Sequence, residues 1–151
     1  MIRKILTCYA ARLEEYLGRT HRKPEGLATV GMIGSSAKER PNKMVVSLLN
    51  VEREPVNGGY IGLRPPLQLN LYVILAAVFD EQRYAESLSL LSDTLGFIQS
   101  TPRFEVDGRD YTIEMVNSSM QELSHIWPLL GGQYYPSVVC KIRRLTIDKE
   151  H

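Results

Sequence analysis

The sequence has few of the residues from which small proteins build covalent, metal-binding or catalytic frameworks. Its 151 residues include two cysteines and three histidines. Cys8 and Cys140 lie far apart and form no CxxC pair, which argues against a disulfide scaffold and favours small buried side chains in a reduced protein. His21, His125 and His151 are scattered, and no serine lies in a G-x-S-x-G elbow. We therefore expect no catalytic residues, no metal site and no cofactor.

Charge of one sign and long apolar runs are also lacking. The formal net charge is +1, so no overall field attracts nucleic acid or acidic lipid. The apolar stretch from Pro65 to Phe79, which has no charged residue, is shorter than the about 20 apolar residues of a bilayer span. The basic start is interrupted at Arg12 and has helical periodicity, unlike a secretory signal peptide. We predict no nucleic-acid partner, no membrane span and no signal peptide, with assembly in the cytoplasm.

The length and the 44% share of hydrophobic residues predict a single domain over residues 1–151 with a real core. Apolar residues recur at helical spacing from Ile2 to Leu17, and Gly18 is expected to cap that helix. Leu27 to Gly34 and Met44 to Val51 are expected to be strands. From Leu67 to Phe79 every odd position is apolar, which is the strongest strand signal in the chain, although Pro65-Pro66 leaves a helix as an alternative.

The second half of the chain shows helical and strand patterns in turn. Asp80 is expected to cap a helix whose apolar seam consists of Tyr84, Leu88, Leu91, Leu95 and Ile98. Asp107-Gly108 predicts a hairpin, and Ser119 with Glu122 predicts a capping box before a short third helix. Together these patterns predict an α/β fold with a mixed sheet, led by the strand from Leu67 to Phe79, and the first two helices packed against one face.

Two surface features are candidates for partner contact. The segment from Asn57 to Arg64 lies in a long loop rich in glycine and proline, and such loops often carry a contact. Ser137 to Ile147 is rich in β-formers and carries three cations, which suits an edge strand or one that faces a partner. Tyr134 and Tyr135 precede it, with strand entry over the core as the alternative role. The predicted interface residues are Arg64, Tyr134, Tyr135, Lys141, Arg143 and Arg144.

Several segments together resemble the cap, or tail-terminator, proteins of extracellular contractile injection systems, which are phage-tail-like particles. They are Pro65 to Val73, Tyr84 to Leu88, Met120 to Leu130 with its Ile126-Trp127 pair, and Leu130 to Arg143. The amphipathic start and the Met44 to Val51 strand also fit, so the resemblance covers essentially the whole chain. The motifs that carry it are structural rather than catalytic.

The resemblance implies a phage tail-terminator-like fold and a hexameric ring that closes the baseplate-distal end of the inner tube and sheath. The implied partners are further copies of the chain, the sheath protein and the inner tube protein, with a cap paralogue or a tape-measure protein as additional candidates. The protein would then be extracellular as part of a released particle. A baseplate or sheath-tube adaptor of the same particle is the alternative, followed by a small hydrolase whose site assembles from distant residues.

Overall fold

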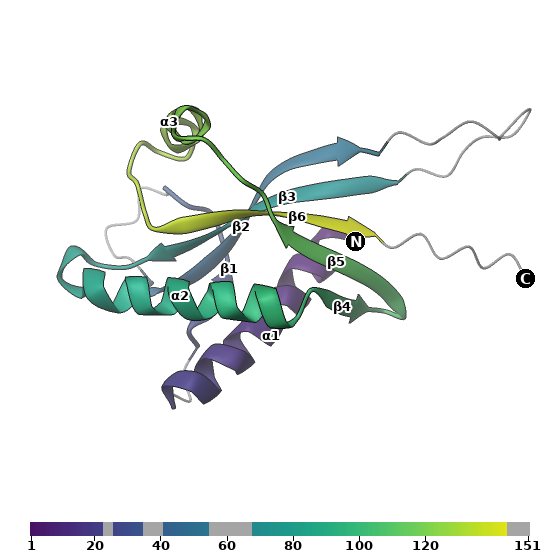
Figure 1. Cartoon of the computed structure of the whole chain (residues 1–151), viewed down its shortest axis with the longest axis horizontal. Coiled ribbons are helices and arrows are strands. Elements are labelled where there is room, and N and C mark those ends of the chain that lie inside the picture. Colours follow the sequence, from purple (N-terminus) through teal and green to yellow (C-terminus); the bar gives the residue numbers. More distant parts are fainter. Residues whose placement is uncertain (23–25, 35–40, 55–67, 145–151) are drawn as a thin grey trace, which may run out of the picture.

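A computed structural model describes residues 1–22, 26–34, 41–54 and 68–144. The elements in chain order are α1 (Ile2–His21), β1 (Ala28–Val30), β2 (Lys43–Arg53), β3 (Leu69–Val78), the short 3-10 helix η1 (Glu81–Arg83), α2 (Tyr84–Ser100), β4 (Arg103–Val106), β5 (Arg109–Met115), α3 (Met120–Leu129) and β6 (Ser137–Arg144) (Figure 1). None of the helices in these ranges is long and apolar enough to cross a membrane.

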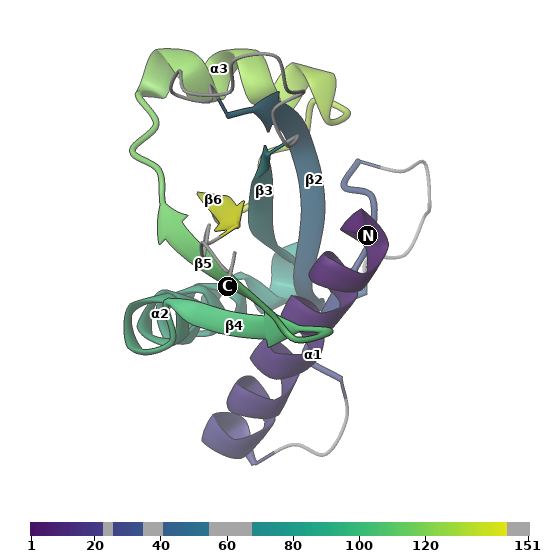
Figure 2. The ribbon, with the colours of Figure 1, turned by 90° about the vertical axis from the view of Figure 1, so that its right-hand side faces the viewer.

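Six strands form one sheet in the order β1-β2-β3-β6-β5-β4. The β1–β2 pair is parallel and the other pairs are antiparallel, so the predicted mixed sheet is confirmed. The sheet curls, and Figure 2 shows β2 and β3 upright, β4 running nearly across them, α1 and α2 below and α3 above. The two faces of the sheet are named here the α1/α2 face and the α3 face.

The β3 strand is the centre of the fold, as its alternating pattern predicts, and the helical alternative is wrong. It pairs with β2 on one side and with β6 on the other. Leu71, Val73 and Leu75 belong to the core on the α1/α2 face, whereas Ile74 and Ala76 belong to the core on the α3 face. Because successive side chains of a strand point to opposite faces, β3 is buried on both sides.

The core on the α1/α2 face is the larger of the two and is rich in aromatic residues. The ring centroid of Tyr9 lies 5.6 Å from that of Phe97 and 5.2 Å from that of Phe104, in tilted arrangements. Tyr9 is fully buried, and its hydroxyl has no hydrogen-bond partner among the described residues. Burial raises the pKa of that hydroxyl, so it stays neutral. The first two helices thus pack against one face of the sheet, as predicted.

The core on the α3 face is smaller and centres on Trp127, which packs with Tyr135, Val45 and Ile74. The loop after β1 meets the end of α3 through two glycines, Gly34 and Gly131, which have φ angles of 80° and 108°. A Cβ on Gly34 would lie 1.4 Å from the carbonyl oxygen of Leu130. Only glycine therefore permits this contact between the two backbones.

Turn and cap chemistry was predicted correctly in two places and wrongly in two. The Asp107-Gly108 hairpin and the Ser119/Glu122 capping box are both present. Gly18 does not cap α1, because the helix continues to His21 and Arg22 takes the left-handed conformation at φ 54°. Asp80 caps η1 rather than α2, and its side chain makes no capping hydrogen bond.

The buried face of α2 differs from the predicted seam. The buried residues are Ser87, Leu90, Thr94, Phe97 and Ile98, so only Ile98 of the predicted seam is fully buried. Two of these five residues, Ser87 and Thr94, are small and polar. Their hydroxyls donate to the carbonyls of Tyr84 (2.6 Å) and Leu90 (2.8 Å), so their burial leaves no polar group unpaired. Tyr84, Leu88 and Leu95 of the predicted seam remain exposed.

Candidate partner surfaces

The strand that carries the predicted cations is not an edge strand. β6 pairs with β3 on one side and with β5 on the other, so its backbone groups are already used. The edges of the sheet are β1 and β4. The prediction of an edge strand is therefore wrong, and the alternative, a strand that faces a partner, stays a prediction. Any contact through β6 must use its side chains.

The cations of β6 split between the two faces of the sheet. Lys141 and Arg143 lie on the α3 face, beyond α3, where their partners come from neighbouring strands. Lys141 Nζ lies 3.5 Å from Glu52 Oε1 and 5.4 Å from the centre of the Tyr72 ring, and Arg143 Nε lies 3.0 Å from Glu114 Oε1. We call these five residues the charged half of the sheet. Its charges alternate in sign, so it is polar but not basic.

An amide at the edge of the charged half is buried. Asn70 is 2% exposed, and its side-chain nitrogen donates to the Glu54 carboxylate. Glu54 also extends the β2–β3 pairing, because its backbone N–H donates to the carbonyl of Gln68 at 2.8 Å. The ends of β2 and β6 and the start of β3 lie on the same side of the molecule (Figure 1).

The remaining predicted interface residues are spread over the molecule. Arg144 is exposed and lies on the α1/α2 side, where it lines a small cavity with Met1 and Tyr111. Tyr135 is buried, which matches the alternative role of strand entry over the core, whereas Tyr134 is 60% exposed and packs edge-on against Trp127. Arg64, with the loop from Asn57, lies outside the described residues. The structure does not bring these residues into one patch.

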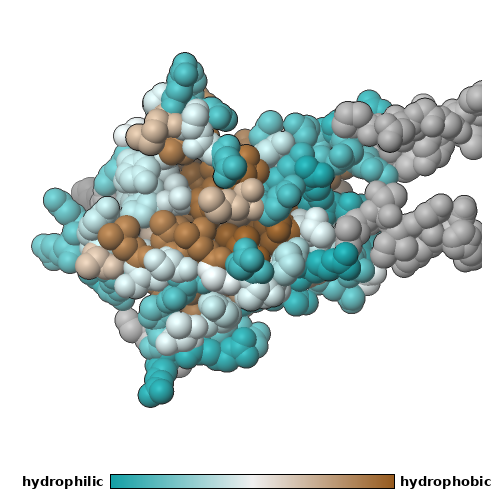
Figure 3. Space-filling model, in the orientation of Figure 1, coloured by the Kyte–Doolittle hydropathy of each residue, from teal (hydrophilic) through white to brown (hydrophobic). Residues whose placement is uncertain are grey.

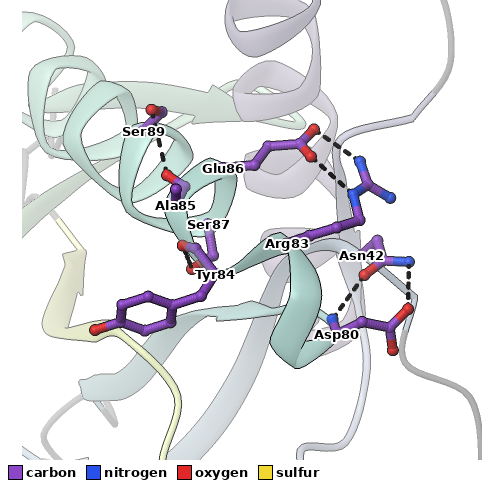
Figure 4. A network of polar contacts seen from close by, with 8 residues as sticks. All are labelled: Asn42, Asp80, Arg83, Tyr84, Ala85, Glu86, Ser87 and Ser89. Carbon is purple, nitrogen blue, oxygen red and sulfur yellow. Dashed lines mark hydrogen bonds and ion pairs between the residues drawn. The ribbon is translucent and has the colours of Figure 1, made fainter.

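A cleft of about 540 Å³ opens at the start of α2. Tyr84 and Tyr134, both more than half exposed, contribute to its lining, together with Asp80 and Glu81. The Asp80 backbone N–H donates to Asn42 Oδ1 at 2.8 Å and its carboxylate accepts from Asn42 Nδ2 at 3.4 Å, which ties this turn to the start of β2 (Figure 4). Two tyrosines and two carboxylates could receive a cationic group.

An arginine next to this cleft is paired with a carboxylate outside the cleft lining. Arg83 donates two hydrogen bonds of 2.7 Å to the carboxylate of Glu86, and this bonding raises the pKa of the guanidinium. Figure 4 shows the Arg83 and Tyr84 side chains pointing in opposite directions from the chain. The positive charge at the start of α2 is thus engaged, which leaves the cleft acidic.

A groove of about 550 Å³ runs beneath α3. Its apolar lining includes Leu48, Val116 and Leu129, and Tyr72 joins it to the charged half. Within the described ranges, no group of three or more His, Cys, Asp or Glu side chains is placed to hold a metal ion. The start of α2 and the α3 face of the sheet thus present an acidic cleft, an apolar groove and a polar sheet face.

Comparison with known protein families shows which family the chain belongs to. The family model described as the Pvc16 N-terminal domain matches residues 7–151. The chain belongs to the Pvc16 N-terminal domain family. Among curated protein sequences, none matches this chain.

A solved structure has the same fold as this Pvc16 N-terminal domain. It is a cryo-EM structure of an extracellular contractile injection system, the PVC sheath/tube terminator in its extended state. The match has a TM-score of 0.63 at 14% sequence identity and covers 97% of this chain. The chain corresponds to 57% of the terminator chain, so the solved protein is considerably longer than the part that it shares with this one.

The surface that sequence analysis missed in this Pvc16 N-terminal domain is the outer flank of α2. Tyr84, Leu88 and Leu95 are exposed by 55%, 41% and 37%, although they were expected in the core. The signal that could have placed them outside is the pairing of Phe97 and Ile98 with Leu90, which defines a second apolar face one step around the helix. The face that is buried also contains Ser87 and Thr94, whose buried hydroxyls no hydropathy pattern reveals.

Proposed function

We propose that this chain is a structural cap that closes the baseplate-distal end of the inner tube and sheath of a contractile injection system, as one subunit of a hexameric ring. The observation that carries the proposal is the fold match over 97% of the chain to a sheath/tube terminator. The family match over residues 7–151 supports it. In this proposal residues 1–151 act as one tail-terminator domain, and the protein is assembled in the cytoplasm and leaves the cell within the particle.

A structural role also agrees with the chemistry of the surfaces. The two larger described pockets are lined mainly by aromatic and apolar side chains, with a few carboxylates, amides and serines, and no hydrogen bond between described residues joins a nucleophile to a base in their linings. A baseplate or sheath-tube adaptor is the second candidate, because such a protein would use similar side-chain surfaces. The two roles differ in which end of the particle the protein occupies.

The charged half of the sheet is the proposed contact with the tube or sheath. It lies on a rigid part of the fold, and its alternating charges can select a complementary surface. Single charges at a rim contribute only about 0 to 1 kcal/mol, so contact through this surface needs several of them together. Arg144, Tyr134 and the loop around Arg64 belong to the proposed interface as additional contacts.

The test is a deletion of the gene followed by complementation in cells that make the particle. Without the cap, we expect sheaths and tubes of irregular length, and wild-type protein restores uniform length. A variant with Glu52→Lys, Lys141→Glu, Arg143→Glu and Glu114→Arg keeps each ion pair with its sign reversed, so it tests docking without leaving a like-charge pair. If this charge-reversed variant folds and restores uniform length, the charged half is excluded as the docking surface. Uniform particles after the deletion would contradict the cap function itself.

A further inference from the structure

The outer flank of α2 presents an apolar stripe that no described element covers. Tyr84, Leu88, Leu91 and Leu95 follow one another at helical spacing, and we call them the leucine flank. Leu91 is half-buried and the other three are exposed. Figure 3 shows hydrophobic side chains gathered in a band across the middle of the face on which α2 lies. Contiguous apolar surface of this kind is typical of a protein contact.

The surroundings of the leucine flank are acidic. Residues 80–100 contain four carboxylates and one arginine. Arg83 is bonded to Glu86, and Asp93 is bonded to His21 of α1, so the acidic character comes from Asp80 and Glu81. Asp80 and Glu81 line the cleft at the start of the same helix, beside the exposed ring of Tyr84. A surface that covers this flank should therefore be apolar at its centre and basic around it.

The neighbouring helix on the same face of the sheet, α1, has this complementary character. The exposed residues of α1 and its cap include five cations and only one carboxylate, Glu15; the cations are Arg3, Lys4, Arg12, Arg19 and Arg22, of which Lys4 pairs with Asp107 at 3.0 Å. The strand β1 packs against α1; its last residue, Val30, is 37% exposed, and Met32 beyond it is 83% exposed. Figure 2 shows α1 and α2 as neighbours below the sheet, and His21 Nε2 of α1 lies 2.6 Å from Asp93 Oδ2 of α2.

We propose that the leucine flank of one copy docks onto the basic face of α1 and the Val30/Met32 surface of a second copy. This inference rests on the proposed ring, for which it names the contact between subunits. A symmetric contact of flank against flank would place acidic surfaces together, whereas the head-to-tail contact pairs opposite charges. A contact between two different patches also repeats from copy to copy, as a closed ring requires.

Cross-linking between two single-cysteine chains tests the contact. One chain carries Ser92→Cys on α2 and the other carries Ala11→Cys on α1, both exposed positions. Both chains also carry Cys8→Ser, and Cys140 is fully buried. With a short bismaleimide reagent, we expect cross-linked pairs in the mixture and few in either chain alone. Dimers within one chain type, or no dimers at all, would overturn the proposal.

Matched variants decide whether the leucine flank itself makes the contact. Leu88→Glu with Leu95→Glu should lower the yield of mixed pairs by about tenfold or more. Met120→Glu with Leu129→Glu changes two residues of α3 that are 84% and 86% exposed, and should leave the yield unchanged. Equal yields in both variants, or a loss only in the α3 variant, would contradict the proposal.

The outcome separates this contact from the cap function. If the mixed pairs form but particles keep uniform length without the protein, the contact is real and the cap function is wrong. If the deletion gives irregular particles but the mixed pairs do not form, the cap function stands and the head-to-tail contact is wrong.

Discussion

The two faces of the sheet are built very differently. Among the described residues, 24 form the buried core on the α1/α2 face, whereas eight form the core on the α3 face. Two long helices cover the first face, while one short helix covers only part of the second and leaves the charged half open. The difference indicates that the α1/α2 face stabilises the fold, and that the α3 face can carry a partner contact without weakening it.

The largest expected loss of stability comes from replacing neighbouring residues on β3 whose side chains face opposite sides of the sheet. Leu75 and Ile74 are both fully buried. We expect Leu75→Ala to cost about 2 to 5 kcal/mol in free energy of unfolding. Ile74→Ala should fall at the low end of the same range, because the thinner layer over the α3 face can collapse into the space. Urea denaturation measures both, and a larger loss for Ile74→Ala would reverse the comparison.

A second effect should be confined to the α3 face. Gly34→Ala would force a Cβ against the Leu130 carbonyl, whereas a Cβ on Gly132, which also has a positive φ, would meet nothing within 4 Å. Both changes carry the left-handed backbone cost of about 1 to 2 kcal/mol. Gly34→Ala should cost more because of the clash. Trp127 is the one tryptophan of the chain, so its fluorescence reports the loss of α3 packing, and equal effects would contradict the glycine contact.

A smaller loss of stability is expected when the cap at the start of α3 is removed. Ser119 accepts a hydrogen bond from the Glu122 backbone N–H at 3.0 Å, and Glu122 accepts one in return from the Ser119 backbone N–H at 3.2 Å. Ser119→Ala should destabilise α3 by about 1 kcal/mol. Trp127 fluorescence should then change at a lower urea concentration than far-UV circular dichroism. Coincident transitions would indicate that α3 unfolds with the rest of the fold.

The smallest expected effect is a difference in reactivity between two thiols that differ in burial. Cys140 is fully buried in the larger core, and burial raises the pKa of its thiol to about 12. Since the thiolate is the reactive form, Cys140 should stay unreactive toward iodoacetamide up to pH 9 in the folded protein, whereas the half-buried Cys8 reacts. Mass spectrometry of the labelled peptides distinguishes the two. Early labelling of Cys140 would mean that the α1/α2 face opens easily.

Most helices, strands and turns could be predicted from the sequence, because each depends mainly on residues that are close together in the chain. The alternation from Leu67 to Phe79 predicted the central strand, and the Asp107-Gly108 turn predicted the hairpin. The position of β6 inside the sheet could not be predicted, since strand order depends on pairings between distant residues. Its cations suggested an edge, but Glu52 and Glu114 on neighbouring strands pair with Lys141 and Arg143.

The candidate surfaces were predicted less well than the fold. Tyr134 and Tyr135 are adjacent in sequence, yet one is exposed and the other is buried under α3. The leucine flank of α2 was placed in the core because it is the more apolar side of the helix. The side that is buried contains two polar residues, Ser87 and Thr94, whose hydroxyls donate to carbonyls of the same helix, and a hydropathy pattern does not show this.

The most direct test of the cap function is cryo-EM of both ends of purified particles that contain this chain. The account predicts density for six copies of the six-stranded fold at the end opposite the baseplate, in contact with the last layer of tube or sheath. Density for the fold at the baseplate, or a terminal ring with a number of copies other than six, would contradict it.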